Sequence, residues 1–380
     1  MFDVIQNRRV LFGTGTIQML PKILEERTQQ TVFVMAFRED APCVDLAVDA
    51  LKKTGHAYVL DASLAGEPST EDIDRIAAKA IAANCGAVVA IGGGSVMDAA
   101  KAVAMLCTNG GSIEQYQMEG KPIDIPALPV IAVPTTSGTG SEASKVSVVY
   151  NPKNQLKKSF YSPSMIAGTV ILDPQLTIDL PKSVTVSTGI DALSHAIESY
   201  VSLNATPYTE MFSLQSMRLV VQSLEACVSD PKDLTARGNM MLASYFGGCA
   251  LNAGIGFAHI IAQPLGGLIK IPHGVACAIY LPYAMRYNVD FSIHKYCEIA
   301  RIFGAEGEDS PALANAGIEQ VAAYLKRLNA PDSIAAYLPD HFDIDAATDA
   351  VLKATGHIQC NPRPVTREAI REVILQSIRG

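Results

Sequence analysis

An aspartate and a histidine lie four residues apart in the stretch Gly189–Tyr200, GIDALSHAIESY, whose composition favours a helix. At this spacing Asp191 and His195 share one helix face, one turn apart. A carboxylate and an imidazole placed in this way can bind the same cation, although such a pair more often forms a cap or a surface contact. Two further histidines follow in ordered surroundings, His259 in GIGFAHIIAQPLGG and His273 in IPHGVA.

These four side chains form the predicted metal site, with ligands Asp191, His195, His259 and His273. One aspartate and three histidines suit Zn²⁺ or Fe²⁺ and leave a coordination position open for a substrate. Taken singly, each downstream histidine is better explained as a partly buried side chain whose hydrogen bonds are satisfied. Support for a metal therefore depends on whether the rest of the chain predicts a site that would use one.

A glycine-rich turn lies in the first half of the chain, within AVVAIGGGSVMDAAK. The turn consists of Gly92, Gly93, Gly94 and Ser95. It follows an apolar run and precedes a helix expected from about Val96. Because glycine has no Cβ, the backbone can approach a phosphate closely, and the N–H groups of a helix start favour the anion. A plain tight turn between a strand and a helix is the alternative interpretation.

A second turn, VPTTSGTGSE, follows the next apolar run and repeats this arrangement. Pro134 ends the expected strand, and residues 135–141 form the loop. Its hydroxyl groups and backbone donors suit a pyrophosphate or a ribose, while a simple loop rich in serine and threonine is equally consistent with the pattern. The two turns together predict a dinucleotide site.

Five short apolar runs alternate with helical stretches over the first ~175 residues. The runs are Thr31–Phe37, His56–Leu60, Ala87–Ile91, Pro129–Pro134 and Thr169–Asp173. Amphipathic stretches such as Val44–Lys53 and Thr70–Ala83 lie between them. This alternation predicts an α/β domain with a parallel sheet covered on both faces and ligands at the carboxyl ends of its strands.

The pattern changes near Asp179-Leu180-Pro181, where proline disfavours helix before it and suits a helix start after it. Long segments rich in alanine and leucine follow, including Val184–Leu203, Tyr208–Cys227, Leu234–Ala253 and Ala312–Leu328. No strand is expected among them. The sequence therefore predicts two domains, an α/β domain over 1–179 and an all-helical domain over 180–380.

The composition of the 380 residues is that of a folded globular protein, with 49% apolar and 18% charged residues. The formal net charge of −8 argues against nucleic acid and against an anionic membrane surface as partners. No run of 18 apolar residues occurs, and the N-terminal stretch has no signal-peptide core. We therefore expect a cytoplasmic protein that acts on small molecules.

Eight cysteines are spread singly along the chain, with no C-x-x-C pair. Most have apolar neighbours, as in GGCALNAG and GVACAIYLP. A reduced cysteine in such surroundings behaves as a small hydrophobe. The sequence thus predicts neither a disulfide framework nor a thiolate metal site.

Taken in order, the motifs resemble those of the iron-containing (group III) alcohol dehydrogenase family. The motifs are GTG at Gly13–Gly15, GGGSVMDAAK, TTSGTGSE, LDPQL, STGIDALSHAIESY, GIGFAH, PHGVACAIYLPYAMRYN and CNPR at Cys360–Arg363. The resemblance covers essentially the whole chain. It implies a Rossmann-like dinucleotide-binding domain followed by an all-α domain, the architecture of dehydroquinate synthase-like proteins.

The resemblance also assigns site residues. It matches Asp191, His195, His259 and His273 to the metal ligands; Gly93, Gly94, Ser95 and Asp98 to the pyrophosphate turn and its helix; and Thr135, Thr136 and Thr139 to the second cofactor loop. Lys157 matches a lysine that contacts the cofactor, with Lys158 as the alternative. The implied cofactors are NAD or NADP and Fe²⁺, with Zn²⁺ as the alternative metal.

The activity that follows is reversible hydride transfer between the nicotinamide and a small alcohol or aldehyde, with the metal polarising the substrate oxygen. The resemblance implies a homodimer or a larger homo-oligomer. The same scaffold also resembles glycerol dehydrogenases and dehydroquinate-synthase-like lyases, so the fold alone leaves those activities open. A binding protein derived from a dehydrogenase scaffold is a further alternative.

Three positions bear on the details. Gln263 stands where the family commonly has a second histidine, and glutamine cannot carry a proton near neutral pH. Arg38, in AFRED, stands where an acidic residue would bind the adenosine ribose, so NAD and NADP are both open. Lys145 and Arg363 could favour an anionic substrate or could simply make structural ion pairs, and Cys360 of the CNPR motif is a further candidate for contact with the substrate.

Overall fold

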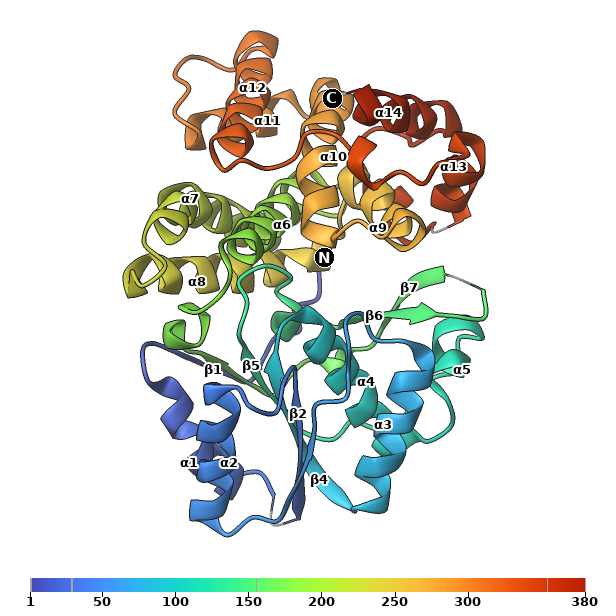
Figure 1. Ribbon diagram of the computed structural model, residues 1–380. Helices are drawn as coiled ribbons and strands as arrows, with labels where there is room; N and C mark the ends of the chain where they lie inside the picture. Colours follow the sequence, from blue (N-terminus) through green and yellow to red (C-terminus); the bar gives the residue numbers. More distant parts are fainter. Residues whose placement is uncertain (1, 29, 155, 354, 380) are drawn as a thin grey trace. The chain divides into compact units, whose positions relative to one another are not determined.

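The computed structural model describes residues 2–28, 30–154, 156–353 and 355–379 (Figure 1). The chain divides into two compact units, Met1–Asp179 and Leu180–Gly380. Each unit has its own buried core and is described separately below.

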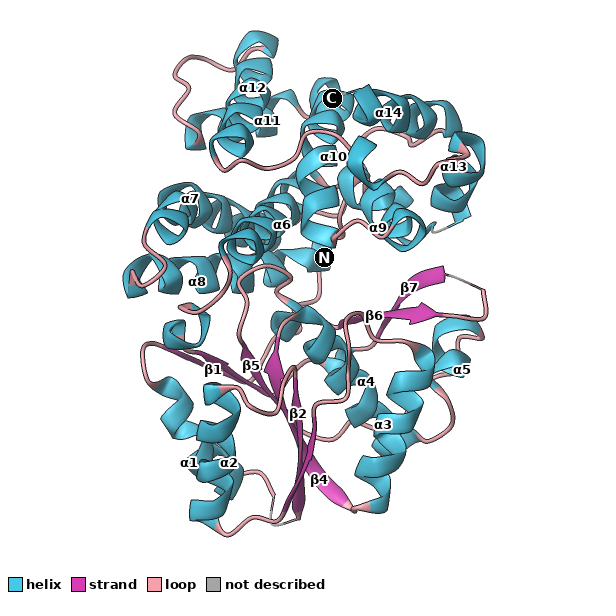
Figure 2. Cartoon of the chain, viewed as in Figure 1, coloured by secondary structure: helices cyan, strands magenta, loops and turns pink. Residues whose placement is uncertain are grey.

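The first unit is built on a six-stranded sheet, drawn in magenta in Figure 2. The strands, in spatial order, are β1 (Arg9–Phe12), β8 (Thr169–Leu172), β5 (Val130–Pro134), β4 (Cys85–Gly92), β2 (Thr31–Ala36) and β3 (Tyr58–Asp61). Every pairing between neighbours is parallel. Since parallel strands end at the same edge, the residues that follow β4 and β5 are placed side by side.

Helices lie on both faces of this sheet, as a run of βα units requires. They are α1 (Leu20–Glu25), α2 (Pro42–Thr54), α3 (Thr70–Ala82) and α4 (Gly94–Asn109), while α5 (Ile113–Met118) packs against α3 and the strand β7 (Leu156–Tyr161). Alternate strand residues such as Val32, Val34 and Val89 pack into one apolar cluster with Leu20 of α1 and Leu51 of α2. The predicted α/β fold with a parallel sheet is confirmed.

All five predicted strands are present, as β2, β3, β4, β5 and β8. The sequence interpretation missed β1, which is only four residues long and alternates half-buried with exposed positions at the sheet edge. It also missed an antiparallel hairpin of β6 (Val146–Asn151) and β7 (Leu156–Tyr161). The second hairpin strand reads LKKSFY, and its two lysines break the apolar run that marked the other strands.

The second unit is helical throughout its described residues. Its helices are α6 (Lys182–Val201), α7 (Pro207–Ser229), α8 (Leu234–Ala250), α9 (Phe257–Ile269), α10 (His273–Asn288), α11 (Ile293–Ile302), α12 (Pro311–Arg327), α13 (Ile344–Lys353) and α14 (Arg367–Arg379). Two apolar clusters hold them, one formed mainly by α6, α7, α8, α11 and α12 and the other by α9, α10, α13 and α14. Helix α10 contributes to both clusters, so it connects the two halves of the unit.

Local sequence explains several helix starts. Thr206 caps α7 by accepting a hydrogen bond from the Thr209 N–H, and Pro207 occupies the first helical turn. Asp233 caps α8 in the same way. Among the described residues no single helix has the length and apolar composition of a membrane span, although the bent pair Leu234–Ala253 and Phe257–Ile269 meets both criteria together.

The backbones of α6 and α10 lie close together at Gly274. A Cβ built on this glycine would lie 2.2 Å from the Ser187 carbonyl oxygen, so no side chain fits unless a helix moves. We expect Gly274→Ala to lower the free energy of unfolding by about 1–3 kcal/mol, the usual cost of overpacking a core. Calorimetry of the metal-stripped protein measures this effect without a contribution from ligands at the neighbouring His273.

The matched control for this variant is Gly267→Ala in α9, where an added Cβ has no heavy atom within 4 Å. Replacing a helical glycine by alanine in open space gains about 0.5–1 kcal/mol. The two variants should therefore shift the thermal midpoint in opposite directions. Equal midpoints would mean that α6 and α10 do not approach one another as described.

Candidate functional site

The first glycine-rich turn lies between β4 and α4. Gly92 is the last residue of the strand, Gly93 is the N-cap, and α4 begins at Gly94. A Cβ on Gly93 would lie 3.2 Å from Thr136 Oγ1, and one on Gly94 would lie 2.5 Å from Thr139 Cγ2. The two predicted cofactor turns are therefore packed against each other, and the close approach requires glycine on the first turn.

Asp98, on the helix α4 that follows the first turn, is hydrogen bonded to the second turn. One oxygen of its carboxylate accepts a hydrogen bond from Ser141 Oγ at 2.5 Å, and the other accepts one from the Val148 N–H at 3.1 Å. Lys101, one turn further along α4, is buried and donates to Ser141 Oγ at 2.6 Å and to the Ser141 carbonyl at 2.9 Å. These contacts assign Asp98 the role of positioning the second turn.

Burial shifts the pKa of both charged neighbours of Asp98. It lowers the pKa of Lys101 below its ordinary value, against the opposing effect of the Asp98 charge. It raises the pKa of the Glu142 carboxyl to about 7, although the charge of Lys101 acts in the other direction. The second turn thus packs on three polar groups that bond to one another, those of Asp98, Lys101 and Ser141.

The other predicted residues of the first unit lie apart from these turn contacts. Lys157, on β7, forms an ion pair with Glu67. The carbonyl of its neighbour Lys158 accepts a hydrogen bond from Gln117. Lys145 lies just before β6, where its carbonyl accepts the Ser162 N–H. Roles for Lys145 and Lys157 at a ligand remain predictions.

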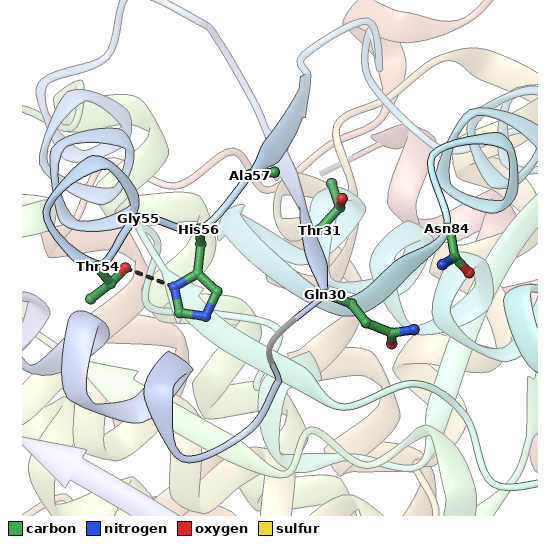
Figure 3. A pocket seen from close by; sticks show the side chains of 7 residues that line it. All are labelled: Gln30, Thr31, Thr54, Gly55, His56, Ala57 and Asn84. Carbon is green, nitrogen blue, oxygen red and sulfur yellow. Dashed lines mark hydrogen bonds between the residues drawn. The ribbon is translucent and has the colours of Figure 1, made fainter.

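A polar pocket lies at the opposite edge of the sheet, at the amino ends of β2, β3 and β4 (Figure 3). It is lined by Gln30, Thr31, Thr54, Gly55, His56, Ala57 and Asn84. The His56 ring is held at both nitrogens, by Thr54 Oγ1 and by the Thr28 carbonyl, each at 2.8 Å. The pocket contains none of the predicted site residues, and ligands of parallel sheets bind at the other edge.

In the second unit, α6 provides one polar face inside an apolar core. Asp191, His195 and Glu198 lie on this face, and each is at most 6% exposed. Their spacing of four and then three residues brings them into line along the helix. Buried charged groups of this kind require partners, and these come from α9 and α10.

Helix α9 presents His259 to this face. Its Nδ1 is hydrogen bonded to Glu198 Oε2, and its Nε2 lies 3.4 Å from Asp191 Oδ1. The other oxygen of Glu198 accepts the Ala258 N–H at 2.6 Å. Nδ1–H donates its hydrogen bond to the Glu198 carboxylate, so Nε2 is the ring nitrogen that faces Asp191. This arrangement is typical of metal-binding histidines.

The start of α9 is held by the C-terminal CNPR motif. Asn361 Oδ1 accepts the Phe257 N–H at 3.1 Å, and its amide pairs with that of Asn288, with both bonds 2.8 Å long. A Cβ on Gly256 would lie 3.0 Å from Asn361 Oδ1 and 3.2 Å from Glu198 Oε1. The free N–H groups at this helix end are thus satisfied by two buried side chains, Glu198 and Asn361.

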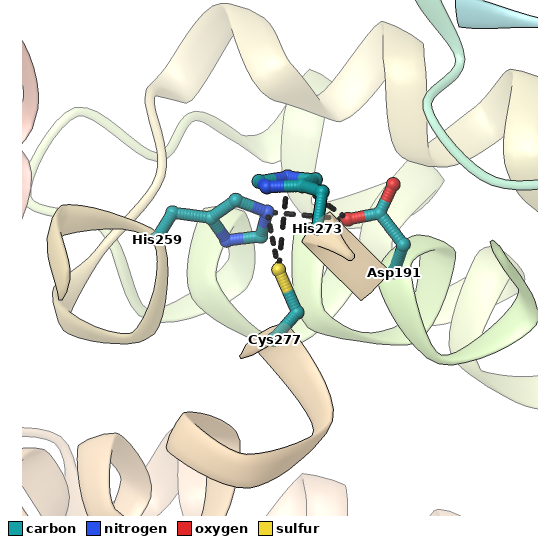
Figure 4. Close-up of side chains that lie close together, drawn as sticks. All are labelled: Asp191, His259, His273 and Cys277. Atoms are coloured by element: carbon teal, nitrogen blue, oxygen red, sulfur yellow. Dashed lines mark hydrogen bonds and ion pairs between the residues drawn. The ribbon is translucent and has the colours of Figure 1, made fainter. Parts of the chain in front are cut away.

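Helix α10 completes the cluster with two residues one turn apart, His273 and Cys277 (Figure 4). His273 Nε2 lies 3.6 Å from Asp191 Oδ1. Cys277 Sγ lies 3.5 Å from His259 Nε2 and 3.7 Å from His273 Nε2. The donor atoms of these four residues all lie within 4.8 Å of one another, so they can hold one metal ion.

His195, the remaining predicted ligand, lies beside this group. Its ring stacks on that of His259 with centroids 4.6 Å apart, and its Nε2 lies 3.7 Å from Asp191 Oδ1. Asp191 therefore has three imidazoles around one carboxylate oxygen. The structure brings together all four residues that the sequence predicted for the metal.

Electrostatics within the cluster favour charge on the carboxylate. Burial by itself raises the pKa of Asp191, but the imidazoles of His195, His259 and His273 outweigh it and hold the pKa far below the usual range. Burial likewise lowers the pKa of His259, but Cys277, Glu198 and Asp191 together raise it well above its ordinary value. Burial raises the pKa of the Cys277 thiol to about 11. This buried, acidic and imidazole-rich donor set fits a divalent cation.

Three residues of the site were missed by the sequence interpretation. Glu198 and Cys277 each continue the helical spacing of a predicted ligand, seven residues after Asp191 and four after His273, so both could have been found. Asn361 carries no such pattern. Cys277 lies in the apolar core, as its neighbours in GVACAIYLP led us to expect, but its sulfur also faces two imidazoles, which the sequence interpretation did not foresee. All eight cysteines are free.

The predicted substrate residues of the CNPR motif are engaged within the second unit. The Arg363 guanidinium lies 4.2 Å from the Tyr287 ring centroid and donates to the Tyr287 carbonyl at 3.2 Å. Cys360 Sγ accepts a hydrogen bond from the Asn204 amide at 3.2 Å. Neither contact is the structural ion pair that was the alternative for Arg363, and the roles of both residues at a substrate remain predictions. Gln263 lies half-buried on α9, one turn beyond His259.

We expect Glu198→Ala to weaken metal binding by roughly 10–100-fold, because loss of an outer partner lets the His259 ring turn and adopt the other tautomer. Competition with a chromophoric chelator measures the affinity. Glu225→Ala, which removes an exposed carboxylate paired with Arg327, is the control and should leave the affinity unchanged. An unaltered affinity in Glu198→Ala would show that this carboxylate does not orient the ligand.

The raised pKa of His259 gives a second prediction. In the metal-stripped protein the imidazole should stay protonated as the pH rises past its ordinary value of 6.5 and lose its proton only above it. The stability that this charge adds is therefore present below pH 6.5 and is lost as the pH rises through the raised value. A ¹⁵N-histidine NMR titration, assigned with His259→Ala, measures it. A midpoint at or below 6.5 would contradict the described partners.

Comparisons with known proteins agree with one another. Residues 7–174 match the family described as iron-containing alcohol dehydrogenase, and residues 185–378 match the C-terminal part of the same family. The chain is 34% identical to the NAD-dependent methanol dehydrogenase of Bacillus methanolicus over 298 residues, 78% of each chain. It is 34% identical to the sulfoacetaldehyde reductase of Bilophila wadsworthia, covering 96% of this chain and 95% of that one.

Among solved structures, a 1,3-propanediol oxidoreductase superposes with a TM-score of 0.95 at 28% identity, and each chain is covered completely. This likeness extends over both units of the chain. It includes the sheet with its two turns and the helices that carry the buried cluster.

Proposed function

The chain belongs to the iron-containing alcohol dehydrogenase family, and we propose that it is a metal-dependent aldehyde reductase and alcohol dehydrogenase that uses a nicotinamide dinucleotide. One observation carries this proposal. Asp191, His259 and His273 come from three helices and place their donor atoms within 4.8 Å of one another, with Asp191 and His259 buried and His273 partly exposed. A bound divalent ion supplies Lewis acidity toward the substrate oxygen, and the nicotinamide supplies or accepts the hydride.

The chain itself contributes binding and orientation. Asp191 stays anionic because three imidazoles surround it, and Glu198 fixes the His259 ring so that Nε2 faces the cluster. Glycines 93 and 94 allow the second turn to pack against the first, and Asp98 holds that turn through Ser141. Gln263 can hydrogen bond but cannot carry a proton, so the proposed mechanism assigns it no proton relay.

For the substrate we propose a short aldehyde or alcohol, uncharged in the first instance. The Arg363 guanidinium stacks on the Tyr287 ring and donates a hydrogen bond to the Tyr287 carbonyl. The cation that an anionic substrate would need is therefore already engaged. An anionic aldehyde, with Lys145 as its partner, is the second candidate, because the similar Bilophila protein is a sulfoacetaldehyde reductase. We also propose that the protein acts in the cytoplasm as a homodimer or larger homo-oligomer, without nucleic acid or membrane partners.

A single screen tests the function. Metal-stripped protein receives Fe²⁺ or Zn²⁺ and then NADH or NADPH with neutral and anionic short aldehydes. We expect metal-dependent oxidation of the reduced cofactor by wild type and none by His259→Ala, which loses a metal ligand. Substitution of His294, an exposed histidine paired with Asp309, is the control and should leave turnover intact. Binding of the cofactor without net turnover of any aldehyde would favour the lyase and binding-protein alternatives.

For the cofactor we propose NAD(H) over NADP(H). Arg38, just after β2, stands where parallel-sheet enzymes contact the adenosine ribose. Its Nε lies 2.6 Å from Asp40 Oδ1, so its charge is already balanced by a carboxylate that would repel a 2′-phosphate. The similar methanol dehydrogenase is NAD-dependent by its name.

Removing that carboxylate should shift the preference. We expect Asp40→Ala to lower the KM for NADPH relative to that for NADH, because Arg38 is freed to pair with the phosphate. Asp49→Ala, which removes an exposed carboxylate near Lys52 on α2, is the matched control. If both variants keep the wild-type ratio of KM values, Arg38 and Asp40 do not lie at the ribose.

A further inference from the structure

Cys277 is the one donor of the buried cluster that the predicted N/O ligand set does not include, although its side chain also borders the apolar core of α9 and α10. Its side chain is completely buried, on the helix face that also carries His273. Its sulfur faces the Nε2 atoms of two imidazoles at 3.5 and 3.7 Å. These are the two nitrogens that also face Asp191 Oδ1, at 3.4 and 3.6 Å.

These separations can be compared with those around a metal ion. With ligand bonds of about 2.0–2.1 Å for nitrogen and oxygen and 2.3 Å for sulfur, a tetrahedral ion separates nitrogen from sulfur by about 3.6 Å and nitrogen from oxygen by about 3.4 Å. Neighbouring octahedral positions would be closer, at about 3.1 and 2.9 Å with the same bonds. The four observed nitrogen–sulfur and nitrogen–oxygen distances, 3.4–3.7 Å, match four of the six edges of a tetrahedron with sulfur at one corner, and all four donor atoms lie within 4.8 Å of one another.

We infer, resting on the metal centre of the proposed function, that Cys277 binds the ion through Sγ together with Asp191, His259 and His273, in the place that the sequence prediction gives to His195. Binding breaks the S–H bond, the proton passes to water, and no electron is transferred. A thiolate is a softer ligand than carboxylate or imidazole, so this set favours Zn²⁺ over Fe²⁺ more strongly than an N/O set does. Zinc sites can expand to five ligands, which leaves a position for a substrate.

A cobalt titration tests this ligand. Bound Co²⁺ gives visible d–d bands, and only a thiolate ligand adds a sulfur-to-cobalt charge-transfer band in the near ultraviolet. We expect both features in wild type, and in Cys277→Ser we expect the visible bands without the charge-transfer band. Cys227→Ser is the matched control, because that cysteine is buried in the α6–α8 core with its thiol pKa also raised to about 11. It should keep the wild-type spectrum.

The Zn²⁺ affinity provides a second readout. Cys277→Ser should weaken Zn²⁺ binding by at least about 10-fold, the lower bound for loss of an outer partner, and should weaken Fe²⁺ binding less. In case the variant does not fold, zinc X-ray absorption of wild-type protein should show a sulfur scatterer at about 2.3 Å.

The outcomes separate the two proposals. Visible cobalt bands without charge transfer in wild type, or a zinc shell of nitrogen and oxygen alone, would overturn the role of Cys277 and leave the dehydrogenase proposal standing. The thiol would then only donate a hydrogen bond to an imidazole. Absence of any bound cobalt or zinc would overturn both, because the metal centre itself would be lost.

Discussion

The second unit depends on the burial of two carboxylates, Asp191 and Glu198, on one face of α6. Charges in such a place are tolerated only when partners surround them. Glu198 receives the His259 ring and a backbone N–H at the start of α9, and Asp191 receives three imidazoles. Helices α9 and α10 can therefore pack on α6 only in a position where their imidazoles and N–H groups contact the two carboxylates. The same contacts thus hold the core together and form the site.

The first unit uses a similar arrangement at a smaller scale. Lys101 is buried against Asp98 and Ser141, and these contacts join α4 to the turn that follows β5. These paired charges contact the second turn through side chains and the Ser141 carbonyl, so they leave the backbone N–H groups of the glycine-rich turns available for a ligand. In both units hydrogen-bonded polar side chains hold the predicted site residues in position. Because these residues are already in place, they need little rearrangement when a ligand binds.

The donor set of the metal centre also shapes its chemistry. Carboxylate and imidazole donors suit several divalent ions, whereas a sulfur donor narrows the choice toward softer ones. The family name specifies iron, but the metal that a given chain selects depends on the residues around it. In the proposed centre this choice depends on a single helix turn, from His273 to Cys277, and the fold itself does not require it.

The sequence by itself determined the two-part fold, five of the strands and the four residues Asp191, His195, His259 and His273, because helical spacing and turn chemistry are local properties. Glu198 and Cys277 were within its reach through the same spacing. The tertiary structure alone decided that Asn361, a hundred residues along the chain, holds the start of α9, and that Cys277 faces two imidazoles. It also placed Arg363 on Tyr287. These contacts join segments distant in sequence, and which buried groups satisfy one another is fixed only when the helices pack.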